Sequence, residues 1–206
     1  MHSIYYTAPY LSVLPKNNAN IKLFEVNNAE LEKISTLQTP QGILALIHIP
    51  VQQKIEAKSL AGNFSLVLDN VQDPGNFGTI IRTADWFAIK NIICSADTVE
   101  AYNPKTVQST MGSLARVNLF YTDLNIFLSE NKLPVFGALL NGNNIYTTNW
   151  GDEGLILLGN EGHGISNELI KKITTPVTIP NFGKAESLNV AVSAAIFCSE
   201  LKRNDK

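Results

Sequence analysis

Short, unbroken apolar runs recur through the central and C-terminal parts of the chain. Runs of this kind are typical of strands buried on both faces of a parallel sheet. Between most of them the apolar positions recur at helical spacing, which predicts helices. Alternating strands and helices indicate an α/β fold with a central parallel sheet, whose ligand site is expected beyond the carboxyl ends of the strands. The predicted strands are 65–69, 91–95, 134–140, 154–159 and 176–180, and the predicted helices are 79–87, 103–114, 124–131, 166–173 and the final segment.

Residues 1–60 follow a less regular pattern. Two strand-like pieces, 21–26 and 42–49, flank a brief helical pattern at 31–35. This is too little for an independent domain, and the polar stretch 54–62 has the composition of a connection. We therefore expect a partial domain and linker over 1–60 and the main domain over 61–206.

The final segment pairs a polar loop with a nearly all-apolar helix. Residues 187–201 carry almost no charge before Glu200, so we expect a helix that is buried on most sides and has no solvent face. Ser187 occupies the expected N-cap position, where its hydroxyl would accept from the amide of Asn189 or Val190. Asn189 would then project from the first turn. A helix N-terminus beside a glycine-containing loop suits a polar ligand, but this stretch alone favours a capped core helix.

Composition narrows the class of protein. The chain has 206 residues, 45% hydrophobic and 17% charged, with a net charge of −2, as in an ordinary globular protein. Binding to nucleic acid would therefore require basic residues gathered on one face or supplied by a second subunit. Cys94 and Cys198 lie far apart in apolar surroundings, which indicates buried free thiols in a reducing compartment. No secretory signal or membrane span is recognised, so the cytoplasm is the expected location and no membrane partner is expected.

One polar cluster follows the first predicted strand. A Pro-Gly turn leads into a helix with apolar residues on one face, beginning near Phe77. Asn76 and Arg82 lie off that face. Taken alone, Asn76 is a turn or cap residue, and Arg82 is a solvated helix arginine for which Asp85 is one available partner.

A second cluster, residues 158–166, runs from a strand into a loop with three glycines. The glycine spacing fits neither the dinucleotide fingerprint nor a phosphate-binding loop, which excludes an oxidoreductase on a doubly wound sheet. His163 has no histidine or cysteine partners at ligand spacing, so we expect no metal site. Glu161 is either catalytic or a cap for local amides.

Two further segments are weak signals of function when taken alone. Residues 139–144 end a buried strand in a turn, and an ordinary turn is the favoured interpretation. Residues 103–117 contain a helix entered through a proline and left through Met111-Gly-Ser, and its flanking Lys105 and Arg116 are either phosphate contacts or ordinary surface charges.

Together these segments resemble the three sequence motifs of the SpoU (TrmH) family of S-adenosylmethionine-dependent RNA ribose 2′-O-methyltransferases, in the SPOUT superfamily. Asn76 and Arg82 match the first motif. Gly159, Glu161 and Gly162 match the second. The third is matched by Ile179-Pro180 and Ser187-Leu188-Asn189. The resemblance covers residues 65–201, and residues 1–60 resemble the latter part of a ribosomal-protein-like substrate-binding domain with a shortened front.

The resemblance implies a deep C-terminal trefoil knot, an exception to the rule against knotted chains. It also implies a homodimer whose interface uses the last helix, and a methyl-donor pocket built mostly from backbone groups of the knot loops. The donor is S-adenosylmethionine and no metal is required. The residues that it assigns to the donor are Leu139, Leu140, Asn141, Gly142, Gly159, Ile179 and Leu188.

The reaction implied is methylation of an RNA ribose 2′-hydroxyl, in ribosomal rather than transfer RNA. By position Arg82 is the family's catalytic arginine, and we expect it to grip a neighbouring phosphate and polarise the hydroxyl rather than act as a free base. Asn76, Glu161, Ser187 and Asn189 would position that arginine and the ribose. The alternatives are a transfer-RNA methyltransferase, or a knotted RNA-binding or assembly protein that has lost catalysis.

Overall fold

The computed structural model describes residues 2–15, 20–51, 55 and 57–203. The chain divides into two compact units, Met1–Val51 and Gln52–Lys206. The first unit ends at Val51, within the stretch 1–60 that was expected to hold a partial domain and its linker. Leu60, at the end of α2 (Ala57–Leu60), is fully buried in a core cluster of the second unit. Residues 54 and 56 of the expected connection lie outside the described residues.

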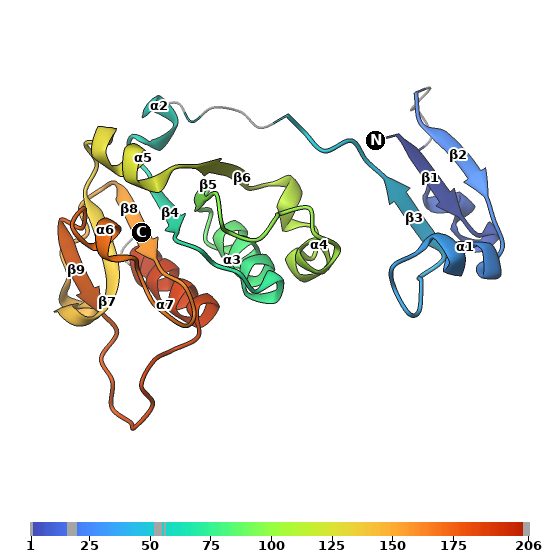
Figure 1. Cartoon of the computed structure of the whole chain (residues 1–206). Helices are drawn as coiled ribbons and strands as arrows, with labels where there is room; N and C mark the ends of the chain where they lie inside the picture. The colour runs from blue at the N-terminus through green and yellow to red at the C-terminus, as the bar shows by residue number, and fades with distance from the viewer. Residues whose placement is uncertain (1, 16–19, 52–54, 56, 204–206) are drawn as a thin grey trace. The chain divides into compact units, whose positions relative to one another are not determined.

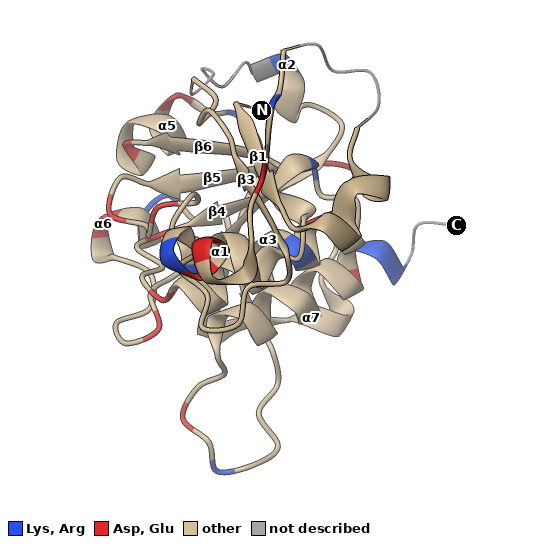
Figure 2. Cartoon of the chain, turned by 90° about the vertical axis from the view of Figure 1, so that its right-hand side faces the viewer, with Lys and Arg blue, Asp and Glu red and all other residues tan. Residues whose placement is uncertain are grey.

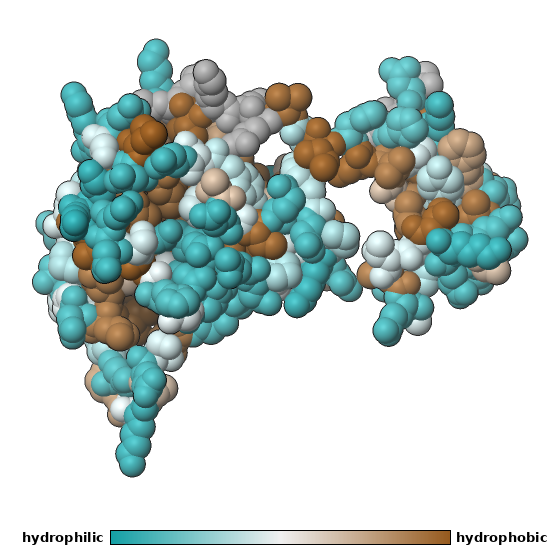
Figure 3. Space-filling model, viewed as in Figure 1, coloured by the Kyte–Doolittle hydropathy of each residue, from teal (hydrophilic) through white to brown (hydrophobic). Residues whose placement is uncertain are grey.

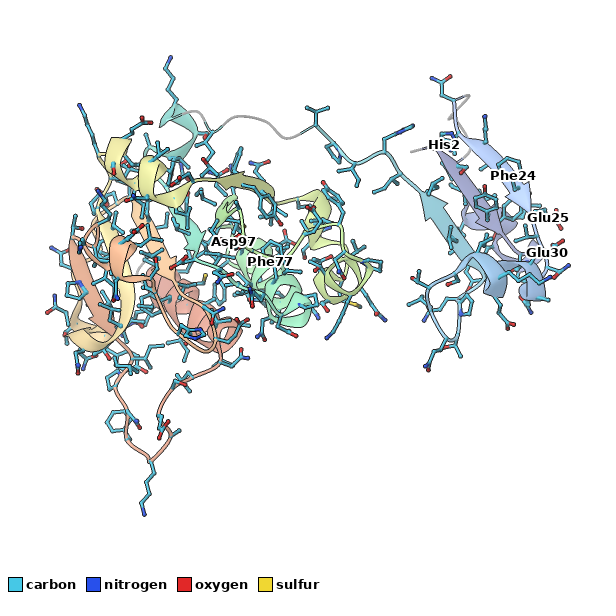
Figure 4. All side chains as sticks on the ribbon, viewed as in Figure 1. His2, Phe24, Glu25, Glu30, Phe77 and Asp97 are labelled. Carbon is cyan, nitrogen blue, oxygen red and sulfur yellow. The ribbon has the colours of Figure 1, made fainter. Side chains whose placement is uncertain are left out.

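The first unit is a small sheet with two short helices. In it β1 is the central strand, parallel to β2 and antiparallel to β3. Ile4, Tyr6 and Leu14 form its core, and Figure 4 labels Phe24 on β2 and Glu30 on α1. The elements are β1 (Ser3–Tyr6), η1 (Ala8–Val13), β2 (Lys22–Glu25), α1 (Asn28–Ile34) and β3 (Ile43–Leu46).

The two strands and the helix expected in this unit are confirmed, and β1 was missed. Helix α1 begins earlier than its apolar pattern indicated because Asn27 and Glu30 form a capping box. The Asn27 side chain accepts from the amide of Glu30 at 3.0 Å, and the Glu30 carboxylate accepts from the amide of Asn27 at 2.9 Å. These bonds satisfy amides that otherwise lack partners at a helix start.

The second unit contains a six-stranded sheet in the order β6-β5-β4-β8-β7-β9, in which all neighbours are parallel (Figure 1). All five expected strands are present, which confirms the α/β class. The sixth, β6, was missed: this edge strand begins with an exposed asparagine, and its short run Leu119-Phe-Tyr is buried only at Phe120. The strands are β4 (Phe64–Leu68), β5 (Asn91–Ser95), β6 (Asn118–Thr122), β7 (Val135–Asn144), β8 (Gly154–Leu158) and β9 (Thr175–Thr178).

Helices cover both faces of this sheet, and the strand residues alternate between the two layers. Leu66 and Leu68 of β4 belong to the core cluster shared with α3 and α7, whereas Val67 belongs to the cluster shared with α5 and α6. Burial on both faces explains why the central strands are apolar throughout. The helices are α3 (Pro74–Trp86), α4 (Pro104–Thr110), η2 (Ser113–Ala115), α5 (Leu124–Glu130), η3 (Ile145–Thr147), α6 (Asn167–Ile170) and α7 (Val190–Arg203).

Local chemistry sets the ends of two helices differently from the expected bounds. Helix α3 starts at Pro74, earlier than expected, because the Asp73 side chain caps it and proline suits the first helical position. Helix α4 stops at Thr110, earlier than expected, because Met111 has a φ of +50° and so leaves the helical region.

The last helix has a solvent face, contrary to expectation. Ala191, Ala194 and Phe197 are buried against the sheet, but Val192 is 48% exposed and Ser199 is exposed. Burial in the core therefore does not by itself explain why this segment carries so little charge. Between β9 and α7 the chain makes a long excursion from the body of the unit (Figure 1), and the end of this loop is hydrophilic (Figure 3).

Candidate active site

The first part of the site is the start of α3. Here β4 ends at Leu68 and leads through a turn to Asp73, whose carboxylate accepts from the amide of Asn76 at 2.7 Å. This bond caps the helix and fixes Asn76 in its first turn. The side chain of Asn76 thereby lies at the carboxyl end of the sheet, as the topology predicts.

The second part is the loop after β8. Asn160 holds this loop together, because its side-chain oxygen accepts from the amides of Gly162 at 2.8 Å and His163 at 3.2 Å. The side-chain amide of Asn160 donates to the carbonyl of Asn70 at 2.7 Å, which ties the loop to the turn after β4. A Cβ on Gly159 would overlap the backbone of Gly164, so only glycine fits at that position.

The third part is the start of α7, where the expected N-cap was wrong. The helix begins at Val190, and its cap is Asn189, whose side-chain oxygen accepts from the amides of Ala191 at 2.9 Å and Val192 at 3.3 Å. Ser187 is exposed, lies before the cap and takes no part in it. Burial of Val190 and Ala191 against the core places the first helical turn here.

A chain of hydrogen bonds joins these three parts. The Asn189 side-chain amide donates to the Asn76 side-chain oxygen at 2.9 Å. The Asn76 side-chain nitrogen in turn donates to the Glu161 carboxylate at 3.0 Å. The three residues are separated by as many as 113 positions in sequence. The structure thus brings together one polar side chain from each of the three sequence motifs.

A cavity of about 630 Å³ adjoins this network and is of the size that holds a cofactor. It is enclosed by the end of β7, the loop after β8 and the segment from β9 to the start of α7. Glu161 and Ser187 line it, and five of the seven residues expected at the methyl donor do so as well: Leu139, Leu140, Gly159, Ile179 and Leu188. Asn141 and Gly142 lie in β7 outside the lining, where a Cβ on Gly142 would come within 2.6 Å of the Pro176 carbonyl carbon.

Arg82 lies apart from the cavity. It follows Asn76 by six positions on α3, about 9 Å along the helix axis, and its side chain is exposed. Among the described residues Arg82 forms no hydrogen bond or ion pair. The basic and acidic residues of α3 and its surroundings are coloured in Figure 2.

Arg82 does not pair with Asp85, the available partner on its own helix. Asp85 instead accepts from the Arg116 guanidinium, with a shortest N···O distance of 2.7 Å, and from the Ser113 hydroxyl at 2.7 Å. The hydrogen bond from Arg116, followed by that from Ser113, lowers the pKa of Asp85, and the same contact raises the pKa of Arg116. Lys105 approaches Asp73 at 3.7 Å, with both side chains largely exposed.

Comparison with known proteins identifies the family. Residues 63–199 match the model of the SpoU rRNA Methylase family. The chain belongs to this family. A *Bacillus subtilis* relative named 23S rRNA (guanosine(2553)-2′-O)-methyltransferase RlmP is 33% identical over 186 residues, which cover 88% of this chain and 73% of the relative.

Solved structures of the same kind are similar over nearly the whole of this SpoU family member. A *Porphyromonas gingivalis* protein assigned to the TrmH family of RNA methyltransferases is 36% identical, with a TM-score of 0.86 over 97% of this chain and 81% of that one. An AdoMet-bound rRNA methyltransferase from *Sinorhizobium meliloti* is 29% identical, with a TM-score of 0.80 over 98% of this chain and 79% of that one.

Sequence reasoning missed two residues that shape the site of this SpoU family member. One is Asn160, the organiser of the loop after β8. The other is Asp69, which is nearly buried and accepts from the amide of Ser166 at 2.7 Å. A signal was available for Asn160, since a short polar side chain at the end of a buried strand, next to glycines, commonly bonds to the backbone of its own turn. No such signal marks Asp69, because its partner Ser166 is 97 positions away in sequence.

The described residues contain no cluster of three or more histidine, cysteine or acidic side chains that could hold a metal ion. His163 is exposed, and its ring nitrogen lies 3.4 Å from the Asn160 side-chain oxygen. Over the same part of the chain, none of the helices has the length and apolar composition needed to cross a membrane.

Proposed function

We propose that this SpoU family member transfers a methyl group from S-adenosylmethionine to a ribose 2′-hydroxyl of RNA. The observation that carries the proposal is the hydrogen-bonded chain Asn189-Asn76-Glu161, which places one residue from each motif beside a cavity of cofactor size. The relative from *B. subtilis* is named for this reaction, and the *S. meliloti* structure contains the donor.

The donor would lie in the cavity between the end of β7, the loop after β8 and the start of α7. The cavity's form suits it, because the absence of a side chain at Gly159 allows the loop backbone to close tightly. When bound, S-adenosylmethionine supplies a methyl group activated by its positively charged sulfur. The lining residues proposed to hold it are Leu139, Leu140, Gly159, Ile179 and Leu188, with Asn141 and Gly142 following them in β7.

The chain must make a weakly acidic hydroxyl reactive. A guanidinium keeps its proton at neutral pH, so Arg82 would bind an RNA phosphate and stabilise negative charge on the 2′-oxygen while the hydroxyl proton passes to solvent water. The exposed position of Arg82, without a partner among the described residues, leaves it available to RNA. Asn76, Glu161, Ser187 and Asn189 would orient the ribose and one another.

We take ribosomal RNA as the substrate class, because the *B. subtilis* and *S. meliloti* proteins are both named as rRNA methyltransferases. Residues 1–60 would contribute to RNA binding, and residues 61–206 would carry the reaction. We place the protein in the cytoplasm, where such RNA is found.

Two finer features of the fold are part of the same proposal. The first is the C-terminal trefoil knot, supported by the pairing of β9 with the irregular end of β7. The second is a homodimer through the exposed side of α7, where Val192, Ala195 and Ile196 line a shallow cavity together with residues of α3.

The proposal is tested by supplying labelled S-adenosylmethionine with rRNA that lacks its native modifications. The RNA is then digested and its nucleosides identified by mass spectrometry. We expect a 2′-O-methylated nucleoside. Label on a base would overturn the assignment of the reaction, and donor binding without transfer to any RNA would favour a binding or assembly protein.

A further inference from the structure

Arg82 and Asp85 are placed where a helix would normally pair them. They lie three positions apart on α3, so their side chains are neighbours on the helix surface, with Cβ atoms about 5–6 Å apart. The two nevertheless form no contact. The Asp85 carboxylate instead binds Ser113 of η2 and Arg116, the residue that ends η2.

The contacts of Asp85 fill most of its capacity to accept hydrogen bonds. The Arg116 side chain donates from Nε at 2.9 Å and from Nη2 at 2.7 Å to Oδ2, and the Ser113 hydroxyl donates to the same oxygen at 2.7 Å. Arg116 Nε also reaches Oδ1 at 3.1 Å. The Arg116 charge neutralises the carboxylate, and the side-on geometry is that of a strong arginine pair.

Asp85 is the more enclosed of the two partners, with 23% of its side chain exposed against 57% for Arg116. Without Arg116 this carboxylate would be a free anion one helical turn from Arg82. An anion there would pair with the guanidinium and would also repel the RNA phosphate that Arg82 is proposed to bind.

We propose that Arg116 and Ser113 are positioning residues for the reaction, which hold the Asp85 carboxylate away from Arg82 and leave Arg82 free to engage RNA. This inference rests on the proposed function. It assigns Arg116 a role different from a phosphate contact and from an ordinary surface charge, because its guanidinium is committed to Asp85.

The test compares Arg116→Ala, Asp85→Asn and the double variant with the wild-type protein in methyl transfer to RNA. Asp85→Asn keeps the shape of the side chain and removes its charge. We expect Arg116→Ala to lower kcat/KM for RNA about three- to tenfold, from Coulomb repulsion near the protein surface, without changing donor affinity. Asp85→Asn and the double variant should stay within about twofold of wild type, because neither has the anion.

If the contact between Asp85 and Arg116 were purely structural, the opposite pattern of activities would be expected. Asp85→Asn would then reduce activity as much as Arg116→Ala, the double variant would recover nothing, and the inference would be overturned. It would also be overturned if the double variant stayed as impaired as Arg116→Ala while Asp85→Asn was normal, since Arg116 would then contact RNA itself. Thermal unfolding midpoints of all four proteins show whether any loss reflects misfolding.

An Arg82→Ala protein separates this inference from the proposed function. If that variant is inactive and the pattern above fails, only the role of Arg116 and Ser113 is wrong. If Arg82→Ala is as active as wild type, the assignment of Arg82 fails, and the inference fails with it.

Discussion

Asn189 uses both ends of its side-chain amide. Its oxygen caps α7 by accepting from the Ala191 and Val192 amides, and its nitrogen donates to Asn76. One residue therefore starts the last helix and joins the third motif to the first. Stability and site geometry depend on different atoms of the same side chain, so they can be separated by substitution.

Asn189→Asp should keep the cap and lose the bond to Asn76. Aspartate is about as good a cap as asparagine, so the free energy of unfolding should change by less than about 0.5 kcal/mol, whereas Asn189→Ala should lose about 1 kcal/mol. The rate of methyl transfer should fall about tenfold or more in both variants, because a tenfold change corresponds to about the free energy of one lost hydrogen bond. Chemical denaturation and single-turnover kinetics measure the two effects. Full activity in Asn189→Asp would show that the bond to Asn76 is dispensable.

At the scale of elements, the loop after β8 is held in shape by close backbone contact. Asn160 and Gly164 form an isolated bridge, with N···O distances of 2.9 and 3.0 Å between their backbones. Gly159 lies against Gly164 so closely that no side chain fits between them. Gly162 is less restricted, since the nearest neighbour of a Cβ there would be the Asn160 side-chain oxygen at 3.4 Å.

Gly159→Ala should therefore displace the loop, whereas Gly162→Ala should not. We expect Gly159→Ala to cost about 1–3 kcal/mol of stability, as overpacking usually does, and to weaken donor binding measured by calorimetry. The matched control Gly162→Ala should change stability by less than about 0.5 kcal/mol. Equal donor affinity in the two variants would contradict the proposal that close packing of Gly159 against Gly164 shapes the donor-binding site.

The inner strands of the second unit are the elements that the pattern of apolar residues predicted best. They are buried on both faces, so their apolar runs are unbroken. The edge strand β6 escaped prediction because it has less neighbouring structure to exclude water. The start of α7 was misplaced because Ser187 and Asn189 are both good cap residues. Only the packing of the helix decides between them.

At the scale of the whole molecule, the sequence motifs predicted which residues belong to the site, but not which of those residues contact one another. The order of the motifs along the chain is visible in the sequence. The bond between Asn189 and Asn76 is not, because it depends on how the sheet brings together two residues that are 113 positions apart. Asp85 likewise had a plausible partner nearby in Arg82, whereas its actual partner is 31 positions away.

The proposed homodimer can be tested through the exposed side of α7. Val192→Glu would place a charge on the apolar surface beside Ile196, and a buried unpaired charge is costly in an interface. We expect wild type to sediment at twice the 22.6 kDa mass of the chain and Val192→Glu to sediment as a monomer. Ile126→Glu, an exposed position on α5, is the control and should remain dimeric. A monomeric wild-type protein would contradict the proposed interface.

The most direct test of the central claim is the effect of Arg82→Ala on two quantities measured side by side, donor affinity and the rate of 2′-O-methylation of rRNA. Arg82 lies outside the donor cavity, so affinity for S-adenosylmethionine should stay within about twofold of wild type. The single-turnover rate should fall by about a hundredfold or more, as expected on loss of a group that stabilises developing charge. An unchanged rate of methylation would contradict the account.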